Sequence, residues 1–380
     1  MNNYRNIVLL LLLLSLSFNG KGQEPLTLSF EEAYKHKKLI TTKDFIDSFV
    51  YLPLETSTDC LIGANPKFSL TEKFIVATDQ NRCLLFDRNN GRFIRQIGHY
   101  GKDPDGYKST RGFISELTES VYFIGWNNDL LRYSFEGKLL SSIRIPNHSN
   151  SLTSTFVIEK YAYLKKDLIV CNILNINGIQ NTLLMVFDEN GNEIKRIPNR
   201  KIAKEHKPVI TTGELNFFYN HDNLLYNVIY NDTIFHLDSD RTDPYIILDR
   251  GKSSAAEGKD MPDKERLILR SFFESGKFIV LIFSMSDNSR YLALYNKTDQ
   301  TLRLSEIQEG ILNDTDDFMP FLPSDIFNDE LLGSIQPLQI IKWVEDNKSA
   351  GRSVPPALKG GISIDPTDNP VIVIGKLKIE

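Results

Sequence analysis

Short apolar runs separated by polar turns recur along most of the chain. Within Phe74–Tyr107, the runs Phe74–Thr78, Cys83–Asp87 and Phe93–Ile97 are each about five residues long, and the turns between them are rich in Asn, Asp and Gly. Turns of about four residues suit antiparallel pairing, because parallel strands need longer connections. This stretch therefore predicts an antiparallel meander.

The same unit repeats further along the chain. Gly91, Gly137 and Gly191 mark equivalent turns and lie 46 and 54 residues apart. The later expected strands are Val121–Gly125, Leu130–Ser134, Leu139–Ile145, Leu168–Ile173, Thr182–Asp188, Glu193–Ile197, Leu224–Tyr230, Thr233–Asp238, Tyr245–Leu248, Lys277–Ser284, Arg290–Asn296 and Leu302–Ile307. Periods of about 40 to 50 residues with several strands each are typical of β-propeller blades.

Several of these strands are apolar on both faces. Leu84–Phe86 and Leu183–Phe187 show no polar alternation, so both faces of the sheet must be covered. Blades stacked face to face provide this cover, whereas a lone meander cannot. The sequence predicts an all-β fold, a six-bladed β-propeller of four-stranded antiparallel blades, with five blades in roughly Cys60–Gln308.

We expect both ends of the chain to contribute to the sixth blade. Asp47–Leu54 would pair with the C-terminal strands Gly361–Asp365 and Val371–Lys378, so that residues 47–380 form a closed ring without free sheet edges. The interval 309–361 breaks the repeat and is expected to be a rim insertion, with a short helix over Leu338–Lys348.

The N-terminus has the pattern of a secretory signal peptide. A basic residue precedes the apolar run Ile7–Leu14, and small or polar residues follow, which predicts cleavage of residues 1–22 near Gly22. The apolar core of about 12 residues is shorter than the roughly 20 that a membrane span needs. We expect an exported protein, periplasmic or extracellular, without a transmembrane segment after processing and without a lipid anchor. Residues 23–46 form a lead-in segment, with a short helix over Glu31–Lys37.

Charge and cysteine content restrict the partners and the redox chemistry. The net charge of −5 gives no general attraction for polyanions, so nucleic acid is not an expected partner.

The three cysteines, Cys60, Cys83 and Cys171, allow one disulfide with a leftover thiol, but two of them lie in apolar runs. We favour buried, unpaired cysteines.

The candidate ligand site lies at one rim, where the turns between inner strands and the links between blades converge. The residues expected there are Asp79, Arg82, His99, Tyr100, Arg111, Trp126 and Asn127. Aromatic faces beside amide and charged groups suit sugar rings or peptide segments. The alternative is that these are ordinary turn residues.

Catalytic and metal motifs are absent from the sequence. No Gly-x-Ser-x-Gly segment presents a nucleophilic serine, and the six histidines are dispersed. Asn313–Asp317 has a weak likeness to a calcium loop, but it lacks the central glycine and the closing glutamate. We therefore assign no catalytic residue, no metal ligand and no cofactor, with calcium as the weak exception.

Segments along nearly all of the mature chain carry a resemblance. They are Tyr51–Thr56, Cys60–Gly63, Val76–Gly98 running into Gly101–Tyr107, Asp368–Val371 and Lys376–Lys378. In these segments the chain resembles the six-bladed β-propeller proteins exported by Bacteroidetes, a family of largely unknown function, with an architecture similar to NHL-type propellers. Such proteins usually have a glycine-rich turn where this chain has Gly101–Tyr107, and fold kinship alone implies no function.

The expected function is that of an exported binding or scaffold module, with a glycan or a peptide or protein as ligand at the channel mouth. A lactonase-like propeller hydrolase or lyase with a channel metal is the first alternative. A structural subunit of a cell-envelope complex is the second.

Overall fold

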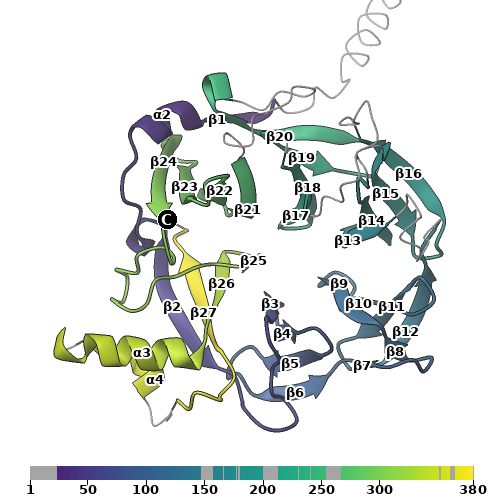
Figure 1. Cartoon of the computed structure of the whole chain (residues 1–380), viewed down its shortest axis with the longest axis horizontal. Helices are drawn as coiled ribbons and strands as arrows, with labels where there is room; N and C mark the ends of the chain where they lie inside the picture. Colours follow the sequence, from purple (N-terminus) through teal and green to yellow (C-terminus); the bar gives the residue numbers. More distant parts are fainter. Residues whose placement is uncertain are drawn as a thin grey trace, which may run out of the picture.

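Six sheets surround a common axis in the computed structural model of the chain (Figure 1). The structure describes residues 24–379, except 147–156, 166, 177, 179, 200–212, 230, 240, 254–266, 351 and 360–363. The expected signal peptide therefore lies outside the described residues. None of the described helices is long and apolar enough to cross a membrane.

Each blade is a four-stranded antiparallel meander, numbered here in chain order. Blade 1 contains β3 (Lys67–Leu70), β4 (Phe74–Thr78), β5 (Cys83–Asp87) and β6 (Phe93–Gln96). Blade 2 contains β9 (Ser109–Ser115), β10 (Ser120–Ile124), β11 (Asp129–Ser134) and β12 (Leu139–Arg144). Blade 3 contains β13 (Ile158–Lys165), β14 (Leu168–Ile173), β15 (Thr182–Asp188) and β16 (Glu193–Pro198).

The remaining blades follow the same plan. Blade 4 contains β17 (Leu215–Asn220), β18 (Asn223–Val228), β19 (Thr233–Leu237) and β20 (Thr242–Asp249). Blade 5 contains β21 (Leu267–Glu274), β22 (Phe278–Met285), β23 (Arg290–Asn296) and β24 (Thr301–Ile307). Blade 6 contains β25 (Asp325–Phe327), β26 (Glu330–Ile335), β27 (Val371–Leu377) and β2 (Ile46–Pro53). The predicted six-bladed propeller is confirmed.

Blade 6 joins the two ends of the chain. β2 is its outermost strand and pairs antiparallel with β27, so that Tyr51 lies opposite Val373. This confirms the predicted closure of the ring. The two inner strands β25 and β26 correct the expectation for the interval 309–361, because Asp325–Ile335 belongs to the sheet itself. Of the expected strand Gly361–Asp365, residues 361–363 lie outside the described residues and the rest is not a strand.

The connection from β26 to β27 carries α3 (Pro337–Asn347), close to the predicted helix, and α4 (Pro356–Lys359). Both helices lie outside blade 6 (Figure 1). Trp343 of α3 packs edge to face on Phe318, which attaches the helix to the core between blades 5 and 6.

The lead-in segment is an integral part of the propeller. β1 (Leu26–Ser29) pairs parallel with β20 and adds a fifth strand outside blade 4. α2 (Phe30–Lys35), which matches the expected short helix, packs along β24 of blade 5. Leu28 and Phe30 are buried, and the ring of Phe30 lies 5.5 Å from that of Phe283. The segment therefore binds blades 4 and 5 together from outside, and it covers the edge of β20.

Six apolar layers hold the blades together, one between each pair of neighbours. Cys83 and Leu85 of β5 belong to the layer shared with blade 2, whereas Leu84 and Phe86 belong to the layer shared with blade 6. Adjacent residues of a strand point to opposite faces, so an unbroken apolar run supplies both layers. The predicted burial of both faces is thus confirmed. The three cysteines are buried and unpaired, as predicted.

Polar contacts join every pair of neighbouring blades as well. The side chains that make them, in order around the ring, are Glu116 (to the Glu72 amide), Arg132–Glu189, Lys165–Asp238, Asn220–Glu274, Arg303–Asp44 and Arg88–Glu330. Charged groups at the strand ends thereby fix the angular position of blades that apolar layers alone would leave free to slide.

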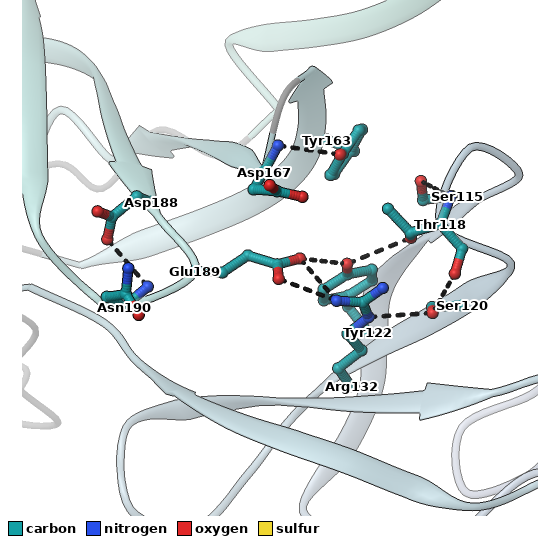
Figure 2. A network of polar contacts seen from close by, with 10 residues as sticks. All are labelled: Ser115, Thr118, Ser120, Tyr122, Arg132, Tyr163, Asp167, Asp188, Glu189 and Asn190. Atoms are coloured by element: carbon teal, nitrogen blue, oxygen red, sulfur yellow. Dashed lines mark hydrogen bonds and ion pairs between the residues drawn. The ribbon is translucent and has the colours of Figure 1, made fainter.

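Blades 2 and 3 are joined by a network around Glu189 (Figure 2). Glu189, in the turn between β15 and β16, accepts hydrogen bonds from Arg132 Nη1 at 2.9 and 3.2 Å and from Tyr122 Oη at 2.8 Å. Arg132 Nε also donates to Ser120 Oγ at 3.0 Å. Both members of the ion pair are only about one-fifth exposed, at 20% and 21%.

Candidate functional site

Turns between the second and third strands of each blade lie at the same end of the propeller as the links from one blade to the next. We call this end the upper rim. It includes the turn Asp79–Arg82, the link from β6 to β9 and the turn from β10 to β11. All seven predicted site residues lie on or next to these segments, but their side chains have different roles.

Asp79 and Arg82 stabilise the turn that contains them. Asp79 Oδ1 accepts hydrogen bonds from the amides of Asn81 and Arg82, both at 2.8 Å, and Oδ2 accepts one from the Gly63 amide at 2.9 Å. Arg82 donates to Gln96 Oε1 at 2.9 Å and to the carbonyl oxygens of two residues in the link from blade 6 to blade 1. Their hydrogen-bonding capacity is therefore largely used within the protein.

His99 has a similar local role in the loop 99–107. The short strands β7 (His99–Tyr100) and β8 (Gly106–Tyr107) pair in parallel, and His99 Nε2 lies 2.7 Å from Asp103 Oδ2. The hydrogen bond from His99 lowers the pKa of the Asp103 carboxyl. A Cβ on Gly106 would lie 2.5 Å from the Gly101 carbonyl oxygen, so this compact loop requires glycine there.

Buried tyrosines anchor the loop to the blades. Tyr107 is fully buried and donates from its hydroxyl to the Asn81 carbonyl oxygen at 2.7 Å. Tyr133 of β11 donates in the same way to the Asp105 carbonyl oxygen at 2.6 Å. Burial raises the pKa of both phenols, which keeps them protonated as hydrogen-bond donors. The loop is consequently held in one position.

The anchored loop forms an aromatic surface with the turn from β10 to β11. Tyr100 is 52% exposed, and its ring centroid lies 6.1 Å from that of the partly buried Trp126. Trp126 Nε1 donates to the Gly101 carbonyl oxygen, which fixes the indole. Lys102 Nζ and Lys108 Nζ lie 5.3 and 5.8 Å from the indole centroid, within the range of cation–π attraction. We call Tyr100, Lys102, Lys108 and Trp126 the Trp126 platform.

Arg111 and Asn127 lie close to the platform along the chain. Both side chains are exposed, and neither has a hydrogen-bonding or ionic partner among the described residues. Arg111 is part of a bulge in β9, where the register shifts between the pairs Tyr122–Phe113 and Ile124–Ser109. Unlike Asp79, Arg82 and His99, these two residues are free to contact a ligand.

Sequence reasoning missed the polar residues of the innermost strands. Lys160 of β13 donates from Nζ to the Leu215 carbonyl oxygen at 2.7 Å and to Asn216 Oδ1 at 2.8 Å. Asn216 of β17 in turn donates from Nδ2 to the Leu269 carbonyl oxygen at 3.0 Å, so three blades are connected around the axis. Burial lowers the pKa of the Lys160 ammonium group. The available signal was the charged pair Glu159 and Lys160 within an otherwise apolar run, Val157–Leu164.

The hollows of the described part are small. The two best-formed cavities hold about 140 and 280 Å³, and they lie beside Phe321 and beside Asn369. Pockets for drug-sized ligands usually measure about 300 to 1,000 Å³. Within the described residues, no three His, Cys, Asp or Glu side chains are placed to share a metal ion.

Comparison with solved structures supports the fold. The crystal structure of a "Putative exported protein (BF0058)" from Bacteroides fragilis NCTC 9343 is similar with a TM-score of 0.63 and 14% identity, covering 93% of this chain and 99% of that chain. Glutaminyl cyclase from Myxococcus xanthus gives a TM-score of 0.34 at 13% identity, over 75% of this chain and 100% of that chain. A search of curated proteins found no match.

The family comparison covers the propeller together with its outer strand. Residues 25–376 match the family described as "Domain of unknown function (DUF4934)", a range that begins just before β1 and ends within β27. The lead-in segment is thus included in the match with the blades that it covers. The chain belongs to the DUF4934 family.

Proposed function

We propose that this protein is an exported binding module that recognises an extended ligand, a glycan in preference to a peptide, on its upper rim. The sequence of residues 1–22 and the description of the structurally similar Bacteroides fragilis protein support export. The binding role is inferred from the Trp126 platform.

The platform has the properties of a recognition surface. Its two aromatic rings are held by an anchored loop, so little conformational entropy is lost when a ligand contacts them. Tyr100 leaves about half of its surface open although it lies in a well-packed region. An exposed ring beside ammonium groups can stack on a sugar ring while the lysines contact its hydroxyl or acidic groups.

The shape of the surface favours an extended ligand. The two best-formed cavities of the described residues hold about 140 and 280 Å³, less than pockets that enclose a drug-sized ligand usually hold, so neither favours an enclosed small molecule. A chain lying across the rim can instead contact Trp126, Asn127 and Arg111 in succession. This geometry fits an oligosaccharide, with the flat faces of its rings on the aromatic side chains.

Binding to glycan and peptide arrays tests the proposal. The mature protein and the variant Tyr100→Ala would be compared, with Tyr34→Ala as the matched control because Tyr34 is 45% exposed but lies on α2 beside blade 5. We expect binding to a restricted set of oligosaccharides, lost or at least tenfold weaker in Tyr100→Ala and unchanged in Tyr34→Ala. Absence of glycan binding, or equal binding by both variants, would contradict the proposal.

A further inference from the structure

Each of the innermost strands around the axis carries polar residues, and we consider here one from the first half of each strand. These residues, which we call the axial ring, are Lys67 of β3, Arg111 of β9, Lys160 of β13, Asn216 of β17, Arg270 of β21 and Asp325 of β25. Figure 1 shows these six strands nearest to the centre of the propeller. Four of the six side chains are cationic, in a chain whose net charge is −5.

Charges on the innermost strands act on ionisable groups of other blades. The charge of Lys67 in blade 1 contributes, after burial, to the lowered pKa of Lys160 in blade 3. Asp325 in blade 6 likewise contributes to the raised pKa of the Tyr219 phenol in blade 4. Lys160 is held by its hydrogen bonds to blade 4, so it keeps its position facing Lys67 despite the repulsion.

The two arginines of the axial ring lie at bulges of their strands. Arg270 is the extra residue between the pairs Leu269–Phe283 and Ser271–Ile282 of β21. Arg111 lies in the bulge of β9, where a Cβ on Gly112 would be only 1.6 Å from the Tyr122 carbonyl oxygen. Bulges redirect side chains and are frequent next to functional sites. Both arginines are exposed in the first half of an innermost strand, and Arg270 Nε donates to Ser284 Oγ of β22 at 2.8 Å, which leaves its other guanidinium nitrogens available within the described part of the chain.

The acidic groups nearby do not neutralise the ring. Glu159, beside Lys160, accepts hydrogen bonds from the Gly213 amide at 2.7 Å and from Asn172 Nδ2. Burial raises the pKa of Asp325 to about 6, against a hydrogen bond from Ser69 that lowers it. A carboxyl with a pKa of about 6 is mostly ionised at pH 7, so Asp325 and Glu159 offset two of the four cations of the ring and leave a formal excess of two positive charges. Lys67 and Arg111 have no ionic partner among the described residues.

The axial ring is continuous with the Trp126 platform through β9. Lys108 of the platform is three residues before Arg111, and its amide donates to the Ile124 carbonyl oxygen beside the Trp126 turn. Two acids lie beside the platform in the loop 99–107: Asp103, which contacts His99, and the exposed Asp105. The excess of cations thus lies on the axial side of the platform.

We propose that the ligand is an anionic glycan, carrying uronate or sulfate groups, whose sugar rings contact the Trp126 platform and whose acidic groups are bound by Lys67, Arg111 and Arg270 of the axial ring. This inference rests on the proposed glycan-binding function. Arginine suits both groups because its planar donors pair with two oxygens at once.

Matched oligosaccharides separate charge recognition from sugar recognition. Calorimetric titrations would use a galacturonate tetramer and its methyl ester, and a chondroitin tetrasaccharide with and without sulfate esters. The variants are Lys67→Gln and Arg111→Gln, and the control is Arg92→Gln, an exposed arginine in the turn between β5 and β6. We expect each ring variant to weaken binding of the acidic form about tenfold, as for loss of one charge-assisted hydrogen bond.

The pattern of outcomes distinguishes the two proposals. Preference for the free acid or for the sulfated form supports the inference and identifies the acidic group. Equal binding of galacturonate and its methyl ester, together with equal binding of chondroitin with and without sulfate and an unchanged Arg111→Gln variant, overturns it while glycan binding stands. If no oligosaccharide of either charge binds, this inference and the proposed function both fail. Binding of the acidic form that resists about 1 M salt would also overturn it, since exposed charges are strongly screened there.

Discussion

Replacing Glu189 by Gln tests whether blades 2 and 3 depend on their shared ion pair. The substitution keeps the size of the side chain and leaves an oxygen for the Tyr122 hydroxyl, which donates to Glu189 at 2.8 Å. It removes the charge that Arg132 contacts at 2.9 and 3.2 Å, and an amide NH₂ now faces the guanidinium (Figure 2). Arg132 then remains as a mostly buried cation without a counter-charge.

The expected loss in the free energy of unfolding lies between two limits. Exposed ion pairs contribute about 0 to 1 kcal/mol, and removing one partner of a fully buried pair costs about 3 to 5 kcal/mol. With the partners 20% and 21% exposed, we expect Glu189→Gln to lower the free energy of unfolding by about 2 kcal/mol. At about 2.1 cal/mol/K per residue, roughly 350 residues give an unfolding entropy of about 0.7 kcal/mol/K, so Tm falls by about 3 °C.

A double-mutant cycle isolates the pair itself. Calorimetry of Glu189→Gln, Arg132→Met and the double variant should give a coupling energy of about 1 to 2 kcal/mol. The matched control is the pair Glu193–Arg196 of β16, which lies within one blade and is 29% and 40% exposed. Its coupling should stay below about 0.5 kcal/mol. Equal coupling for the two pairs would refute the argument that contact between blades gives the Arg132–Glu189 pair its importance.

Three further predictions concern the backbone, the lead-in segment and pH. Gly112→Ala should prevent correct pairing of β9 with β10, because its Cβ would lie 1.6 Å from the Tyr122 carbonyl oxygen; soluble yield and Tm should fall sharply, and a native Tm would contradict this. Phe30→Ala should lower the free energy of unfolding by about 3 to 5 kcal/mol in denaturant titrations, since Phe30 is 3% exposed against Phe283, whereas the exposed Leu39 tolerates the same change. Burial raises the pKa of Asp325 to about 6, so the folded state binds the proton of this carboxyl more tightly than the unfolded chain does. The free energy of unfolding therefore falls as pH rises from about 4 through about 6. Asp325→Asn should remove that fall. The free energy of unfolding of the variant, relative to that of the natural protein, should therefore rise by up to about 3 kcal/mol between about pH 4 and about pH 6. A difference in unfolding free energy that is constant with pH would disprove this.

The second and third strands of the blades could be predicted because burial on both faces leaves a strong local pattern. β4 and β5 match the predicted runs at every residue. The innermost strands were missed because one edge of each borders the axis and tolerates polar residues, as Ser109–Ser115 shows. Residues 330–335 are a strand, although their apolar spacing also fits a helix that continues into α3. Such short runs acquire their structure from the sheet that they join.

The position of the candidate site followed from topology, whereas the roles of its residues depended on distant contacts. The repeat was sufficient to place Trp126 and Tyr100 at one rim. The partners of Arg82 are carbonyl oxygens of Asp59 and Leu61, which follow the closing blade, and no local pattern indicates them. Asp79 was different, because an aspartate two residues before Asn81 is typical of a side chain that caps its own turn. Its structural role was accessible from the sequence.

The proposed axial ligand contacts lie on the innermost strands, which are not the main source of the apolar layers between blades. The apolar layers are built from the second and third strands, where a substitution in either face disturbs the contact with a neighbouring blade. The innermost strands contribute less to these layers, and their bulges at Arg111 and Arg270 add residues that the sheet does not need for pairing. A change of side chain at such a bulge can alter the charge around the axis at little cost in stability, because no layer between blades is affected. If the axial ring binds ligand, propellers of this family can therefore acquire different ligand preferences through the bulged residues while their blade packing stays the same.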